Sequence, residues 1–110
     1  MEKHSLTALA RTLLEGARSS STGRSARTVY GGHEHFLRQT MVALLEGRAL
    51  DDHDGPGEAT LHVLSGRVRL VGEDAEWEGI AGDLLVVPTA RHRLDALQDS
   101  AFLLTVCTRS

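Results

Sequence analysis

The sequence predicts an all-β fold, a sandwich or barrel of antiparallel strands, preceded by one N-terminal helix. Short apolar or alternating segments recur about every ten residues after residue 25, which is typical of such folds. Turn-forming pairs such as Gly31-Gly32 and Ser65-Gly66 separate these segments. No second stretch has helical periodicity, so the strands are expected to pair antiparallel and to close most of the sheet edges.

The first element is predicted to be an amphipathic helix over residues 5–18. Ser5 is a suitable N-cap, and the small polar residues of segment 19–23 favour a loop that ends the helix. The apolar residues have the spacing of one helical face: Leu6, Leu9, Ala10, Leu13, Leu14 and Ala17.

Seven strands are predicted to follow, and turn signals bound each of them. With 110 residues, the chain is expected to form a single domain, with the barrel spanning about residues 26–108. The predicted strands cover residues 26–30, 36–45, 60–64, 68–71, 84–87, 92–97 and 101–107.

Composition excludes several classes of protein. A hydrophobic fraction of 41% and a charged fraction of 25% are typical of a globular protein. The net charge of −3 and the aromatic fraction of 4% disfavour nucleic-acid binding, which uses basic and stacking side chains. No apolar run reaches the ~20 residues that cross a bilayer, so no membrane partner is expected. Cys107 is the only cysteine and no signal-peptide pattern is present, so we expect a cytoplasmic protein.

Two stretches, residues 53–68 and 82–94, carry a specific resemblance. In the first, Gly47 precedes His53 by six residues and Gly66 closes the motif; in the second, Gly82 precedes Pro88 by six. In their order and spacing the two stretches resemble the paired motifs of the cupin superfamily. The resemblance covers roughly residues 36–107 and implies a double-stranded β-helix, or jelly roll, of the RmlC-like kind. In this family the mouth of the barrel holds a metal or a small ligand.

The first motif departs from the family pattern at its metal ligands. Counted back from Gly66, the family's first histidine falls on His53, but the second falls on Gly55 and the glutamate on Ala59. Glu58 is adjacent to that position, but neighbouring strand residues face opposite sides of a sheet. The resemblance therefore implies an incomplete metal site.

The second motif is one residue shorter than in the family, so a strict count puts Arg93 at the position of its histidine. Alternation favours His92 instead, because His92, Leu94 and Ala96 share one predominantly apolar face. His33 and His35 are two apart and would share a strand face, so they are candidates for the missing ligands. The alternative is that they are surface or strand-edge residues, and His62 is expected on the outer face of its sheet. A divalent transition metal such as Fe, Mn, Ni or Zn would need three or four such ligands.

The predicted ligand-binding wall combines His53 and His92 with residues of two strands: Gln39, Met41, Ala59 and Leu61. Met41 has a second interpretation as an ordinary core residue. Trp77, which precedes Gly79 on a strand, is expected either to cover the end of a sheet or to stack on a ligand.

Three functions remain open at this point. The first is a small cupin that binds a small organic ligand in its barrel, in a sensor or binding role. The second is a metal-dependent enzyme of the oxygenase or isomerase type, using His53 and His92 with His33 or His35. The third is a structural or regulatory subunit of a homodimer, since apolar residues occur on both faces of the strands over 84–87 and 102–104.

Overall fold

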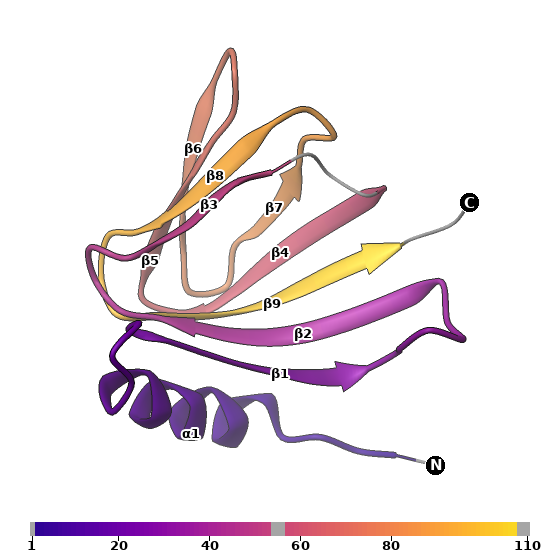
Figure 1. Ribbon diagram of the computed structural model, residues 1–110, viewed down its shortest axis with the longest axis vertical. Coiled ribbons are helices and arrows are strands. Elements are labelled where there is room, and N and C mark those ends of the chain that lie inside the picture. The colour runs from indigo at the N-terminus through magenta and orange to yellow at the C-terminus, as the bar shows by residue number, and fades with distance from the viewer. Residues whose placement is uncertain (1, 54–56, 108–110) are drawn as a thin grey trace.

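The computed structural model describes residues 2–53 and 57–107, with the backbone alone for residues 51–53. Within these ranges the chain forms one helix and nine strands, arranged as two sheets with the helix on the outside (Figure 1). The elements are α1 (Leu6–Arg18), β1 (Arg24–Tyr30), β2 (Leu37–Leu44), β3 (Ala49–His53), β4 (Glu58–Ser65), β5 (Arg67–Val71), β6 (Glu76–Ile80), β7 (Leu84–Val87), β8 (His92–Ala96) and β9 (Ser100–Cys107).

The two sheets differ in size and share no strand. Sheet A has the order β1-β2-β9-β4-β7, and sheet B has the order β3-β8-β5-β6. Every pairing is antiparallel, as the sequence predicts. One end of the barrel is referred to below as the mouth. The strands β4 and β8 begin at the mouth, and the strands β3, β7 and β9 finish there.

The predicted helix is confirmed almost to the residue. Ser5 is the N-cap, and its side chain accepts a hydrogen bond from the Ala8 amide at 3.3 Å. The apolar face of α1 covers the outer face of sheet A, where Ala10, Leu13 and Ala17 pack against Met41 and Ala43. In the described part of the chain, no helix has the length and apolar character needed to span a bilayer.

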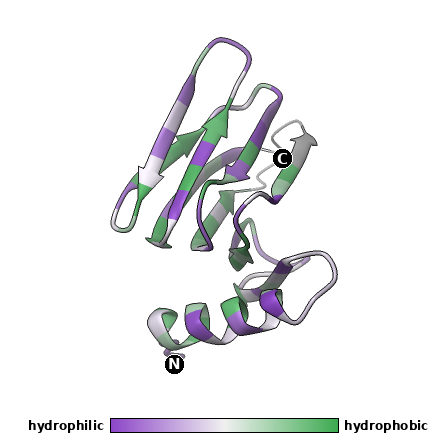
Figure 2. Ribbon diagram, turned by 90° about the vertical axis from the view of Figure 1, so that its left-hand side faces the viewer, coloured by the Kyte–Doolittle hydropathy of each residue, from purple (hydrophilic) through white to green (hydrophobic). Residues whose placement is uncertain are grey.

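A larger core lies between the sheets. Its fully buried members include Phe102 of β9, Leu44 of β2 and Leu70 of β5. Hydrophilic and hydrophobic residues alternate along the strands of sheet B, because one face contacts this core and the other faces solvent (Figure 2). On the outer face, Asp95 binds Arg93 at 3.0 Å and Arg69 at 3.5 Å.

Two strands of sheet B depart from the sequence prediction. β3 is absent from the predicted strands, and β6 is anticipated only as the strand that carries Trp77. Both are edge strands of sheet B with acidic residues, Asp51 and Asp52 in β3 and Glu76 and Glu78 in β6. A strand with one unpaired edge tolerates charge, so neither shows the apolar signal on which the prediction depended. The predicted end of the barrel at residue 108 lies outside the described residues.

Candidate functional site at the mouth of the barrel

The inner wall near the mouth is built by strands of both sheets. In sheet A, Ala59 stands opposite Val87 on one side and Val106 on the other. Ala59 and Leu61 are buried in the main core, which confirms that they face the interior of the barrel. From sheet B, Leu94 packs into the same core. The wall is therefore apolar at β4, β7, β8 and β9, whereas β2 places Arg38 and Thr40 on the same face, opposite Val106 and Leu104.

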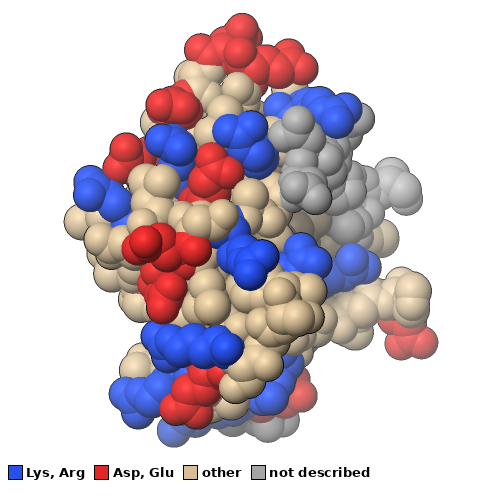
Figure 3. All heavy atoms as spheres, turned by 60° about the vertical axis from the view of Figure 1, so that its left-hand side comes forward, with Lys and Arg blue, Asp and Glu red and all other residues tan. Residues whose placement is uncertain are grey.

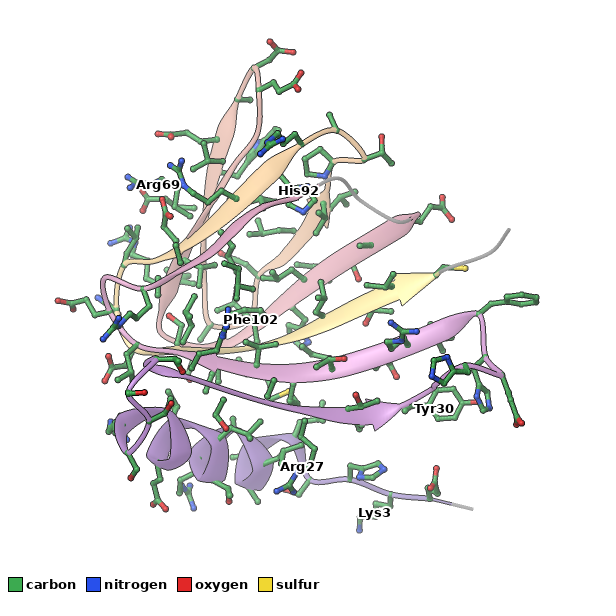
Figure 4. The ribbon with its side chains drawn as sticks, in the orientation of Figure 1. Lys3, Arg27, Tyr30, Arg69, His92 and Phe102 are labelled. Carbon is green, nitrogen blue, oxygen red and sulfur yellow. The ribbon has the colours of Figure 1, made fainter. Side chains whose placement is uncertain are left out.

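His92 is the one buried histidine among the described side chains. It is 6% exposed and lies at the start of β8 on the inward face (Figure 4). Its Nδ1 is 2.9 Å from the Ala90 carbonyl oxygen. Because a carbonyl oxygen only accepts hydrogen bonds, Nδ1 of His92 donates in this contact, which fixes the orientation of the ring.

The alternation argument for His92 is confirmed. His92, Leu94 and Ala96 are all buried, whereas Arg93 is turned to the outer face and paired with Asp95. Beside His92 is a depression of about 210 Å³ that sequence reasoning did not find. Its lining comes from the β5–β6 connection and from both sides of His92: Val71, Gly72, Glu73, Arg91, His92 and Arg93. The only sequence signal for this depression was the pair of arginines, Arg91 and Arg93, on either side of His92.

His53 stands directly opposite His92 in the pairing of β3 with β8. A register irregularity between Leu50 and His53 precedes this pair. Residues opposite one another in antiparallel strands are close neighbours, so the register places both predicted histidines at the mouth. The side chain of His53 lies outside those described, as does Gly55.

His33 and His35 differ from the expectation that they share a strand face. They lie in the connection between β1 and β2, where the His35 amide donates to the Gly32 carbonyl at 3.1 Å. Both side chains are exposed, and the His35 ring meets Tyr30 edge-on at 5.1 Å. Figure 4 shows Tyr30 at the end of sheet A and His92 in sheet B, on separate elements. Among the described residues, no group of three or more His, Cys, Asp or Glu is arranged to hold a metal.

Gln39 and Met41 do not line the barrel, contrary to the prediction. Met41 is fully buried but packs under α1, and Gln39 donates from Nε2 to Thr105 Oγ1 at 3.2 Å on the same outer face. The alternative interpretation of Met41 as a core residue is correct, but the core in question is the one between α1 and sheet A. Because α1 covers this face, β2 is buried on both faces from Met41 to Leu44, and an apolar pattern on both faces does not reveal which one faces the barrel interior. Val42 faces the main core instead.

The apolar residues that suggested a homodimer fall into two groups. Leu103 packs with the core beneath α1, so the helix of the same chain accounts for it. Leu84 and Val86 remain exposed, at 61% and 73%. Homodimer formation therefore remains a prediction that depends on β7.

Two packed antiparallel sheets with an inward-facing histidine at their open end define a cupin barrel. No protein-family model and no curated protein matches the chain. Several solved structures are similar to the chain. An RmlC-like cupin from Desulfovibrio desulfuricans has 25% identity and a TM-score of 0.74, over 98% of this chain and 97% of that one. A conserved protein of unknown function from Streptococcus pyogenes has 24% identity and a TM-score of 0.73, over 83% and 79%.

A third similar structure is KdgF from a Halomonas species, with 20% identity and a TM-score of 0.67 over 79% of this chain and 82% of that one. The match to the RmlC-like cupin spans both chains almost completely, so it includes α1 as well as the barrel. The chain has the fold of a small RmlC-like cupin.

Proposed function

We propose that this cupin binds a small organic ligand at the mouth of its barrel, in a sensing or binding role. The observation that supports the proposal is the buried ring of His92, held by Ala90 near the apolar side chains of Ala59, Leu61 and Leu94. Binding sites for small molecules commonly combine apolar walls with a few fixed polar groups. The apolar side chains favour an apolar body, and the imidazole of His92 is a fixed polar group beside it.

Among the described side chains at the mouth, the donors do not form the three-ligand set that a transition metal generally needs. The residue at the position of the family's glutamate is Ala59, which is buried and has no donor atom. His33 and His35 are exposed in the β1–β2 connection. We therefore derive no chemical step through a metal.

A metal-dependent enzyme of the oxygenase or isomerase type is the second candidate, because the register sets His53 opposite His92. In that case His53 and His92 would hold the metal with His33 or His35. The third candidate, a structural subunit, would leave the mouth without a ligand.

We also propose that the protein is located in the cytoplasm, which cell fractionation tests.

The decisive experiment combines metal analysis with ligand screening of the untagged protein, purified without chelator. We expect metal well below one equivalent per chain, a melting temperature that a chelator does not change, and stabilisation by at least one organic compound. A ligand that binds only the native state stabilises it by mass action. Near-stoichiometric metal that is lost in the double variant His53→Ala, His92→Ala would favour the enzyme instead.

Matched variants locate the binding. His92→Ala should abolish the thermal shift produced by any compound found in the screen. His62→Ala is the control, because His62 is half-buried on the outer face of β4. An equal loss of binding in both variants would contradict a site at the mouth.

A further inference from the structure

The strand β2 places two polar side chains on the inner wall of the mouth. β2 begins at the mouth, where β9 ends, and the two strands pair without an irregularity along the whole length of β2. Met41 lies on the outer face beneath α1, whereas Val42 belongs to the core between the sheets. Because successive strand residues point to opposite faces, Thr40 and Arg38 share the inward face with Val42.

Burial along this inward face shows where the barrel is open. Arg38 is exposed, Thr40 is half-buried and Val42 is buried. On β9 beside them, Leu104 and Val106 are only partly buried against the main core. β2 and β9 diverge from β3 and β8 toward the mouth (Figure 1). We call the four residues at this opening the open wall: Arg38, Thr40, Leu104 and Val106.

The open wall combines one cation with an apolar surface in two adjacent rows. Arg38 stands opposite Val106, and Thr40 stands opposite Leu104. The first row continues from Val106 to Ala59 of β4, whose side chain is short and 9% exposed. Neighbouring strands lie about 4.8 Å apart, so the row from Arg38 to Ala59 is about 10 Å long. A small molecule can therefore lie on Leu104 and Val106 with one end at Arg38.

Arg38 has no counter-charge within the described part of the chain. No ion pair or hydrogen bond joins its guanidinium group to another described residue. Glu58 is in the neighbouring row of sheet A, but it alternates with the buried Ala59 and so faces the outside of the barrel. The guanidinium is thus available to an anion that enters the mouth.

The overall charge of the chain does not favour an anion. The net charge is −3. Figure 3 shows acidic side chains gathered at the top of the molecule, where the β5–β6 hairpin of sheet B ends. Arg38 lies in sheet A, on the inward face. A preference for anions would therefore be a local property of the open wall.

We propose that the ligand of the mouth is a small apolar carboxylic acid, with its carboxylate bound by Arg38 and its apolar body on Leu104 and Val106. This inference rests on the proposed function, because it names the class of ligand for the same site. A guanidinium group presents parallel N–H donors that match the two oxygens of a carboxylate. Removing the apolar body from water adds affinity, and Thr40 supplies a hydroxyl group beside the guanidinium.

Three probes with one skeleton and different head groups test the charge preference: 3-phenylpropionate, 3-phenylpropanol and 3-phenylpropylamine. Dissociation constants are obtained from NMR titrations of the protein at low ionic strength. We expect the carboxylate to bind at least about tenfold more tightly than the alcohol, because its bonds to Arg38 are charge-assisted. The amine should bind most weakly, since Arg38 repels it. Added salt should reduce the advantage of the carboxylate.

Matched variants locate the carboxylate. Arg38→Gln should bind the carboxylate and the alcohol about equally, with little change in melting temperature because Arg38 is exposed. Arg27→Gln is the control and should keep the preference, since Arg27 is also exposed in sheet A but stands opposite Met41 on the outer face. Thr40→Glu should remove binding of the carboxylate by placing a like charge on the open wall. Gln39→Glu makes the same change in charge one residue away, on the outer face, and should not.

The inference is overturned, and the proposed function is not, if the alcohol or the amine binds as tightly as the carboxylate. The same holds if Arg38→Gln and Arg27→Gln behave alike. If none of the three probes binds, the compounds found by thermal screening decide. Anionic compounds whose binding Arg38→Gln abolishes would support the inference, and compounds whose binding it leaves unchanged would contradict it. A screen in which no compound binds overturns the proposed function and this inference together.

Discussion

Gly66→Ala should be among the most destabilising single-methyl additions in this protein, and Gly47→Ala provides a matched control. Both glycines have a φ of +84°. A residue with a Cβ pays about 1–2 kcal/mol in this left-handed region, partly offset by the ~0.4–1 kcal/mol that lower entropy of the unfolded chain returns. Around Gly47 no heavy atom lies within 4 Å of the added Cβ. The control should therefore lose about 1 kcal/mol of unfolding free energy.

At Gly66 the added methyl group has no room. It would collide with the Asp99 carbonyl oxygen and Ser100 Oγ, and it would lie 2.7 Å from Ser100 Cα. Ser100 is fully buried, accepts from the Arg67 amide at 3.0 Å and donates to the Gln98 carbonyl oxygen at 2.8 Å. Displacing it disturbs buried hydrogen bonds worth about 1–3 kcal/mol, in addition to a packing cost of similar size.

The expected loss for Gly66→Ala is therefore about 3–5 kcal/mol, a large part of the ~5–15 kcal/mol of a typical domain. Urea unfolding followed by far-ultraviolet circular dichroism measures both variants, and the slope of free energy against urea should not change. A difference of less than ~1 kcal/mol between the losses of unfolding free energy in the two variants would show that crowding around Gly66 does not destabilise Gly66→Ala.

Three further predictions use the same urea assay. Ser5→Ala should cost about 1 kcal/mol by removing the N-cap bond to Ala8, and an unchanged midpoint would show that α1 does not depend on it. Phe102→Ala should cost about 3–5 kcal/mol through the cavity it leaves, against less than ~0.5 kcal/mol for Ile80→Ala at the surface. Asp95→Asn should cost no more than about 1 kcal/mol, because it weakens partly exposed ion pairs with Arg93 and Arg69; a loss above ~2 kcal/mol that salt does not change would contradict this account.

Sequence patterns predicted the architecture because the fold follows from alternation and turn chemistry. The helical spacing from Leu6 to Ala17, and the turn glycines of the two cupin-like stretches, were sufficient to predict α1 and the barrel. The inward direction of His92 was also predictable, since its neighbours at alternate positions are apolar.

The errors arose where one face of a strand is covered by an element distant in sequence. Gln39 and Met41 were assigned to the interior, but the sequence of β2 does not reveal that α1 packs on it. The interpretation of His33 and His35 as metal ligands required a strand, whereas the chain reverses direction there and both side chains are exposed, in agreement with the alternative of surface residues.

The position of β9 has a consequence for the folding kinetics of the protein. β9 lies between β2 and β4 in sheet A, so each of these strands lacks one of its two neighbours until residues 100–107 are available. On the ribosome, most of this sheet must wait for nearly all of the described chain to be synthesised. Pairings between residues so far apart in sequence are slow to form, and we expect folding in the range of milliseconds to seconds. Until β9 pairs, the apolar inward faces of β2 and β4 are exposed to solvent and can associate with other chains. Aggregation is therefore most favoured in the interval before β9 docks.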